Sequence, residues 1–220
     1  MFAEIRHGLR GLTGAKAEDK EAVQRWIMLD VETTGLNPRV DQLLAIAAVA
    51  MRFSPINNRL ELCIGDSFEV VLKQETPSAR DNILIHHIGV QAQTGGCEPR
   101  EALESFRAWA GQSPLLAFHA AFDEAMITRA FERYALPALS NEWLDIEPIA
   151  RLVGGHAKAR ALDDWMTHFG IECAVRHQAA SDAFATAELL LRLWPAARKE
   201  ARSWSELRKL ARNAAWIPQS

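Results

Sequence analysis

One short apolar run that ends in two acidic residues constrains the fold of this chain more than any other feature of its sequence. The run Trp26–Leu29 leads directly into Asp30-Val31-Glu32 and then into the turn-forming residues Thr33-Thr34-Gly35. A short apolar run bounded by turn residues indicates a buried strand. Because alternate residues of a strand point to the same side, Asp30 and Glu32 would project together from its end. Two like charges there destabilise the fold unless the strand end is exposed to solvent, one acid is protonated, or a cation lies between them.

The composition is that of a globular protein, with 49% hydrophobic and 24% charged residues in a chain of 220. Its longest uninterrupted apolar run, residues 43–51, falls well short of the ~18 residues that a membrane-spanning helix requires. Residues 1–25 contain no apolar signal core. The three cysteines, Cys63, Cys97 and Cys173, lie too far apart for a disulfide framework or a zinc site. We therefore expect no membrane protein, and a cytoplasmic location.

The net charge of −3 conceals an uneven distribution along the chain. Residues 26–197 carry 14 basic and 22 acidic side chains, a net charge of 14 − 22 = −8, whereas residues 198–212 carry six basic and two acidic ones, a net charge of 6 − 2 = +4. The acidic body would repel a nucleic acid unless bound cations neutralised some of its carboxylates. The basic segment is either a solvent-exposed amphipathic helix or a patch that guides phosphates.

The order of the expected elements indicates an α/β fold. Two further strands, 43–52 and 60–72, continue from the first as an antiparallel meander. After them the apolar residues recur at helical spacing, and strands and helices alternate. The later elements are expected as a helix from Pro99 to Gly111, a strand at 115–118, a helix ending at about 134, a helix at 162–169 that Gly170 ends, and a long helix from about Ala179 that ends before Pro195. Strands first, then mixed strands and helices, predict a mixed sheet flanked by helices.

The chain shows no internal repeat and no linker rich in Pro, Gly or Ser that would divide it. Compact domains usually contain about 100–200 residues, so this length favours one domain over two. We predict an N-terminal arm at 1–24, one domain at 25–197, and a basic C-terminal helix at 198–220 that packs on the domain.

Two acids farther along the chain, and one histidine, are also candidates for a site. Asp123 follows a short apolar strand and either belongs to a site or caps the helix that it opens. Asp182 lies on the same face of the last long helix as Ala179 and Leu189, and because this face should be buried, the carboxylate requires a partner. His177 precedes this helix in a loop that could hold it near Asp182, although a single histidine is more often structural or simply exposed.

These candidate residues lie in three short segments that are best considered as one set. They are Asp30-Val31-Glu32-Thr33-Thr34-Gly35, His119-Ala120-Ala121-Phe122-Asp123 and His177-x4-Asp182-Ala183-x-Ala185-Thr186. In order and spacing they resemble the signature motifs of the DEDDh 3′–5′ exonucleases, the family of the proofreading subunit of bacterial DNA polymerase III. Ile85-His86-His87-Ile88 resembles the His-Gly-Ile segment between the first two motifs. Two positions depart from the family pattern, because Ala120 replaces its asparagine and His87 replaces its glycine. These departures concern fine positioning and substrate contacts rather than the metal ligands.

The resemblance implies a ribonuclease H-like fold and hydrolysis of phosphodiester bonds with two divalent cations, Mg²⁺ or Mn²⁺. By this resemblance Asp30 bridges both cations, Glu32 and Asp182 hold the one that carries the attacking water, and Asp123 supports the second. His177 is then the general base, since a histidine with an unperturbed pKa of about 6.5 is available in its neutral form at neutral pH. Oxygen ligands suit Mg²⁺ and Mn²⁺, whereas zinc favours clusters of Cys and His.

The same resemblance implies a nucleic-acid substrate, preferentially the 3′ end of single-stranded DNA, with nucleoside 5′-monophosphates as products. The backbone near Thr33 and Thr34 would contact the terminal 3′-OH, and Leu36 would wedge against the last bases unless it is a turn residue that covers the core. A duplex end would have to fray before its last nucleotide entered such a site. Proofreading or repair, in association with a polymerase, would fit this family.

The sequence leaves two other functions open. One is an exoribonuclease that trims short RNA, because the same metal chemistry serves both sugars. The other is a non-catalytic subunit associated with a polymerase, against which the presence of all five catalytic groups argues.

Two further features have both a binding and a structural interpretation. The pattern Gln112-x-x-Leu115-x-x-Phe118 is superficially similar to a sliding-clamp peptide, but it overlaps an expected strand and should be buried. Trp204 and Trp216, near the basic tail, would either stack on bases or pack the C-terminal helix onto the domain. We favour packing, because large aromatic side chains mainly serve cores.

Overall fold

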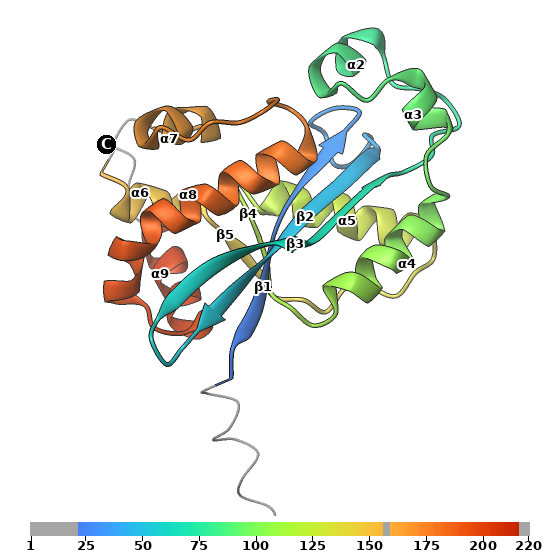
Figure 1. Ribbon diagram of the computed structural model, residues 1–220. Coiled ribbons are helices and arrows are strands. Elements are labelled where there is room, and N and C mark those ends of the chain that lie inside the picture. Colours follow the sequence, from blue (N-terminus) through green and yellow to red (C-terminus); the bar gives the residue numbers. More distant parts are fainter. Residues whose placement is uncertain (1–21, 156–158, 216–220) are drawn as a thin grey trace, which may run out of the picture.

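A computed structural model describes residues 22–155 and 159–215, and within them the chain forms one five-stranded sheet (Figure 1). The strands are β1 (Gln24–Thr33), β2 (Leu43–Ser54), β3 (Arg59–Val71), β4 (Leu115–Ala117) and β5 (Trp143–Asp145), and their order across the sheet is β3-β2-β1-β4-β5. β1, β2 and β3 form an antiparallel meander, whereas β4 is parallel to β1 and β5 to β4. The sheet is therefore mixed, with β1 at its centre.

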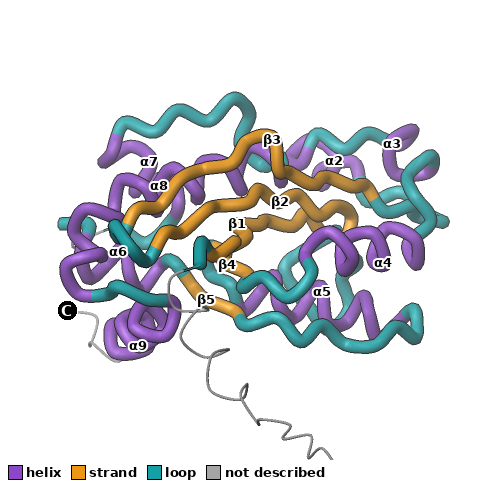
Figure 2. The backbone as a smooth tube through the Cα atoms, turned by 60° about the horizontal axis from the view of Figure 1, so that its bottom comes forward, coloured by secondary structure: helices purple, strands orange, loops and turns teal. Residues whose placement is uncertain are grey.

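Side chains alternate along β1, so the two faces of this strand contribute residues to two different hydrophobic cores. Trp26 and Met28 belong to the core that is covered by α6 (Glu147–Val153), α7 (Leu162–Phe169), α8 (Ala179–Glu200) and α9 (Trp204–Ala215). Ile27, Leu29 and Val31 belong to the core that is covered by α4 (Pro99–Ala110) and α5 (Ala121–Arg133). Figure 2 shows the sheet between these two layers of helices. The other helices of the described residues are α2 (Arg80–His86) and α3 (Val90–Thr94).

The predicted mixed sheet flanked by helices is confirmed, and one predicted boundary is wrong. The long helix expected to end before Pro195 continues as α8 to Glu200. Pro195 has no N–H to donate, so one hydrogen bond within the helix is lost. Its neighbours Trp194 and Ala197 are buried against the core, and this packing stabilises the turns on either side of the proline.

The segment that is similar to a sliding-clamp peptide lies inside the sheet, as expected. Leu115 and Leu116 are fully buried in β4, which lies between β1 and β5. The N–H of Ile27 also donates to the carbonyl of Pro114 at 2.9 Å. A clamp could not bind this segment without opening the sheet.

The basic segment begins in the last turn of α8 and continues into α9, which packs on α6 and β5. Leu207 of α9 is fully buried, and the ring centroid of Trp204 lies 5.4 Å from that of Trp26. The indole N–H of Trp204 donates to the carboxylate of Glu142. These contacts support the packing interpretation for Trp204, whereas Trp216 lies outside the described residues.

The predicted arm at 1–24 falls almost entirely outside the described residues, and β1 begins at Gln24. The division of the chain into 1–24, 25–197 and 198–220 therefore stays a prediction. Within residues 22–155 and 159–215, no helix is both long enough and apolar enough to cross a membrane.

Replacing Trp204 with Ala separates its packing role from a role in binding bases. Because the half-buried indole contacts the fully buried Trp26, we expect the free energy of unfolding to fall by about 2 kcal/mol in urea titrations. Affinity for a single-stranded oligonucleotide should stay unchanged. The exposed Arg202, just before α9, provides a matched surface control as Arg202→Ala. Weaker oligonucleotide binding without loss of stability would contradict the packing role.

Candidate active site

Three acids from two elements converge at the end of β1. Carboxylate oxygens of Asp30, Glu32 and Asp182 all lie within 4.8 Å of one another. Asp30 and Glu32 follow Trp26 and Met28 on the same side of β1, the side that α8 covers. Asp182 lies in the first turn of α8. The strand's alternation and the packing of α8 across the sheet therefore bring these carboxylates together.

Asp123 is the fourth acid of the predicted set, and it lies beside this group of three. It is buried in the first turn of α5, whose N-cap is Ala120 and has no side-chain cap hydrogen bond. Asp123 therefore does not occupy the N-cap position of α5. Backbone hydrogen bonding from Val31 holds its carboxylate against β1, and the charge of Asp123 acts directly on Asp30.

The crowding of these acids raises their pKa values. Burial and the charges of Asp123, Glu32 and Asp182 raise the pKa of Asp30 well above its usual range. Burial also raises the pKa of Glu32, although a hydrogen bond from His86 opposes the shift. The pKa of Asp123 is raised by burial, against the effect of its backbone hydrogen bonds. Bringing these negative charges together is unfavourable, and a bound cation would relieve it.

The donor atoms fit a hard divalent cation. Glu32 is 4% exposed, and its Oε1 has no hydrogen-bond partner among the described residues. A buried carboxylate oxygen without a donor is costly unless something positive contacts it. The nearby ligand atoms are carboxylate oxygens, which Mg²⁺ and Mn²⁺ prefer. The predicted ligands Asp30, Glu32 and Asp182 therefore satisfy the chemistry of a metal site, with Asp123 adjacent.

His177 lies in the loop between α7 and α8, as its position in the sequence predicts. Its backbone has a φ of 60°, in the left-handed region, and its N–H donates to Asp182 Oδ2 at 3.1 Å. The side chain is exposed, and its charge acts on Glu32. The imidazole is thus next to the acids and accessible to solvent.

The predicted substrate-binding residues form a tight turn after β1. Thr33 Oγ1 donates to the carbonyl of Gly35 at 2.7 Å, and the carbonyl of Thr33 accepts from Asn82 Nδ2 at 2.8 Å. Thr34 Oγ1 donates to Asp41 at 3.1 Å. Leu36 is 87% exposed, so the alternative that it covers the core is wrong.

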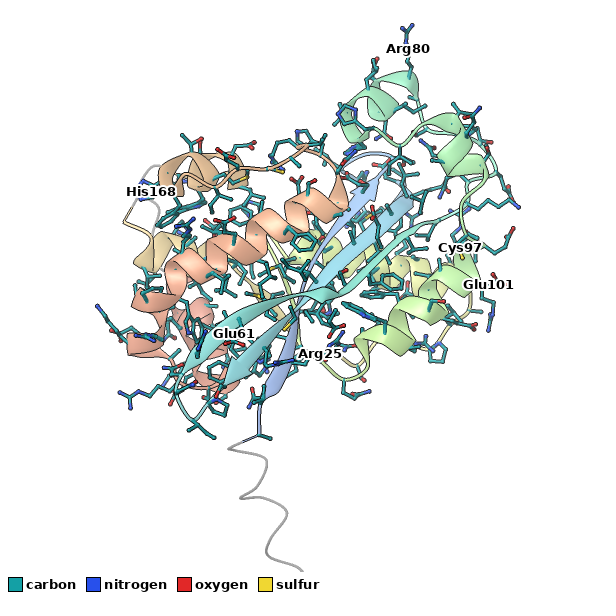
Figure 3. All side chains as sticks on the ribbon, viewed as in Figure 1. Arg25, Glu61, Arg80, Cys97, Glu101 and His168 are labelled. Atoms are coloured by element: carbon teal, nitrogen blue, oxygen red, sulfur yellow. The ribbon has the colours of Figure 1, made fainter. Side chains whose placement is uncertain are left out.

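The short helix α2 lies over the same end of β1 and carries a residue for which the sequence predicts no role. His86, in its last turn, contacts Glu32. None of the residues of α2 is buried, and Arg80 at its start points away from the body of the protein (Figure 3). The His-Gly-Ile resemblance was the one sequence signal for His86. His87 ends α2 with a φ of 57°, which explains why glycine suits this position in the family pattern.

Two more charged residues near the acids also had no predicted role. Asp145, at the end of β5, accepts the N–H groups of His119 and Glu147 at 2.9 and 3.0 Å, and its charge raises the pKa of Asp123. Arg176 forms an ion pair with Asp182. The one sequence feature that pointed to Arg176 is its position next to His177. A single arginine in a loop, however, does not indicate a specific function.

Comparison with known sequences identifies related proteins. A family model described as Exonuclease (RNase_T) matches residues 27–190. The DNA polymerase III PolC-type of Listeria innocua is 30% identical over 168 residues, which cover 76% of this chain and 11% of that protein. The PolC-type polymerase of Staphylococcus haemolyticus is 27% identical over 174 residues, 79% of this chain and 11% of that protein. The chain thus spans about a tenth of the length of these relatives.

Comparison with solved structures finds the same fold. A structure of exonuclease I superposes with a TM-score of 0.65 at 17% identity and covers 80% of this chain and 44% of its own. Escherichia coli exonuclease I in complex with a dA16 oligonucleotide gives 0.64 at 18% identity, covering 84% and 45%. Exonuclease X in complex with 5′ overhanging duplex DNA gives 0.62 at 17% identity, covering 84% and 99%. The predicted ribonuclease H-like fold is confirmed.

The matched region contains all three motifs on which the DEDDh resemblance rests, from Asp30 through Asp123 to Asp182. Sequence, fold and the position of the acids agree with one another. The chain belongs to the RNase_T exonuclease family.

Proposed function

We propose that this protein is a metal-dependent 3′–5′ exonuclease that removes nucleotides from the 3′ end of single-stranded DNA and releases nucleoside 5′-monophosphates. The observation that carries the proposal is the approach of carboxylate oxygens of Asp30, Glu32 and Asp182 to within 4.8 Å of one another. In addition, Glu32 Oε1 is buried and has no hydrogen-bond partner in the part of the chain that the structure describes. An acidic cluster of this kind would repel DNA without metal. Metal-free protein is therefore expected to bind substrate poorly.

In this proposal the four acids would divide between two cation positions. Asp30 would bridge both ions, Glu32 and Asp182 would hold the ion beside the attacking water, and Asp123 would support the other. When bound, two Mg²⁺ or Mn²⁺ ions would lower the pKa of the attacking water and neutralise charge on the phosphoryl and leaving oxygens. The fold holds Asp30 and Glu32 on a central strand, so they need little reorganisation to act as ligands.

His177 would accept the proton of the attacking water. Its exposed ring projects from a loop, while its backbone N–H stays bound to Asp182. This contact keeps the imidazole beside a metal ligand without immobilising its side chain. General-base catalysis requires such proximity to the proton that is removed.

The turn after β1 would receive the terminal nucleotide. The backbone at Thr33 and Thr34 would contact the 3′-OH, and the exposed Leu36 would pack against the last unpaired bases. Some structural neighbours are complexes with DNA, and the similar sequences belong to polymerases. We therefore propose DNA as the substrate and association with a polymerase, in proofreading or repair. The three free cysteines support a reducing compartment such as the cytoplasm.

A gel time course with 5′-labelled substrates tests this function. Single-stranded DNA, blunt duplex DNA and single-stranded RNA are incubated with Mg²⁺, Mn²⁺ or EDTA. We expect a ladder that shortens by one nucleotide at a time on single-stranded DNA, slower loss from the duplex, and no reaction in EDTA.

Each alternative gives a different pattern in the same assay. Faster shortening of RNA than of DNA would indicate the exoribonuclease. Absence of a ladder under every condition would favour the non-catalytic subunit. Release of the 5′ label as a short product without a ladder, or cuts at internal positions, would contradict a 3′–5′ exonuclease.

A further inference from the structure

Arg176 places a positive charge inside the acidic site. One guanidinium nitrogen contacts Asp182 Oδ1, and Nε lies 2.5 Å from Asp163 Oδ1. The side chain of Asp182 is 8% exposed, that of Arg176 27%, and that of Asp163 60%. The arginine thus links a buried metal ligand to an acid at the protein surface, in the first turn of α7.

Both oxygens of Asp182 already have protein partners. Oδ1 is bound by Arg176 and lies 3.6 Å from the sulfur of Cys173, and Oδ2 accepts the backbone N–H of His177. A divalent cation needs direct access to a ligand oxygen, at about 2.0–2.1 Å for Mg²⁺. It would also repel a guanidinium in the same place. A cation and Arg176 therefore cannot both have full use of Asp182.

The charge of Arg176 compensates part of the repulsion among the acids. It lowers the pKa of Asp30, against the effects of burial and of the three other carboxylates. Burial by itself would lower the pKa of Arg176, but hydrogen bonds to Asp163 and Asp182 raise it above its usual value, so the guanidinium stays charged. In the absence of metal, Arg176 does electrostatically part of what a bound cation would do.

We propose that Arg176 is a built-in counter-charge that competes with a divalent cation for Asp182, and that Asp163 holds the arginine aside once the cation binds. This inference rests on the proposed function, because it concerns the same acids. It gives Arg176 and Asp163 opposite effects on metal affinity. Arg176 weakens metal binding by occupying Asp182, and Asp163 strengthens it by offering the arginine a second partner.

Calorimetric titration of the full chain with Mn²⁺ and with Mg²⁺ tests the two effects separately. For Arg176→Gln we expect the Kd for Mn²⁺ to fall about three- to tenfold, because one competitor is removed. For Asp163→Asn we expect the Kd to rise about two- to fivefold, because Arg176 then has Asp182 as its remaining partner. A purely structural role would weaken metal binding in both variants.

A charge control and a stability measurement complete the test. Arg192→Gln removes the same charge from an exposed ion pair on α8, 2.7 Å from Glu188, and should change the Kd less than about twofold. In EDTA, Arg176→Gln should melt at a lower temperature than the wild type, and saturating Mn²⁺ should abolish this difference.

Several outcomes would overturn the inference. These are an unchanged Kd in Arg176→Gln, an equal fall in Arg192→Gln, or a melting difference that persists in saturating Mn²⁺. If the wild type binds Mn²⁺ and hydrolyses DNA but Arg176→Gln leaves the Kd unchanged, this inference alone fails. If the wild type binds neither cation, the proposed function fails with it.

Discussion

Replacing Asp30 with Asn should abolish phosphodiester hydrolysis at every Mg²⁺ concentration and, at the same time, stabilise the metal-free protein. Activity is lost because Asp30 would bridge both cations, and we expect turnover to fall by at least about 10⁴-fold. Stability rises because the substitution removes a half-buried charge that burial and three nearby carboxylates make unfavourable. A gain of about 1 kcal/mol in the free energy of unfolding, measured by urea titration in EDTA, is expected.

The pH dependence of stability provides an independent test of the repulsion among these acids. Because the folded-state pKa of Asp30, Glu32 and Asp123 is raised, the native protein binds more protons than the unfolded chain between the usual and the raised values. The metal-free wild type should therefore lose stability as the pH rises through this window, and Asp30→Asn should lose less. Asp81→Asn, at an exposed position on α2, is the control. Lower stability of Asp30→Asn in EDTA would contradict the predicted repulsion.

The sequence predicts those parts of the site that follow from the repeat of side-chain directions along a single strand or helix. Alternation along β1 places Asp30 and Glu32 on one face, and the helical repeat places Asp182 on the buried face of α8. Their meeting, however, depends on how α8 crosses the sheet. Spacing within an element does not give that angle, so the convergence itself came from the family resemblance.

The elements that the sequence did not predict are short or held by contacts distant in the chain. β5 has three residues and α2 and α6 have seven each, too few for a period to emerge. β5 is defined by its pairing with β4. Arg176 is likewise recognisable only once α7 brings Asp163 and α8 brings Asp182 to it.

The two departures from the family pattern have local explanations of different kinds. His87 adopts the left-handed conformation that glycine tolerates best, so α2 ends there at some cost in backbone strain. Ala120 is 3% exposed and begins α5 without a side-chain cap. An asparagine in its place would bring an amide to the entrance of α5. Both departures lie within residues 27–190, the region that matches the exonuclease family.

Replacing His177 with Ala should lower turnover by about 10²–10⁴-fold and leave metal binding unchanged. The loss is the usual contribution of a general base. Metal binding should persist because the contact between residue 177 and Asp182 is made by the backbone N–H and not by the imidazole. Single-turnover assays give the rate, and calorimetry with Mn²⁺ gives the affinity.

A second variant separates the chemistry of His177 from the shape of its loop. At a φ of 60° alanine is strained, whereas asparagine tolerates the left-handed region, so His177→Asn keeps the backbone and removes the base. Turnover should fall by a similar factor in both variants, and added imidazole should restore part of the activity of His177→Ala. If His177→Asn kept the wild-type rate while His177→Ala did not, the loop conformation and not the imidazole would be what matters. Unchanged turnover in both would remove His177 from the reaction altogether, and another group would have to take the proton of the attacking water.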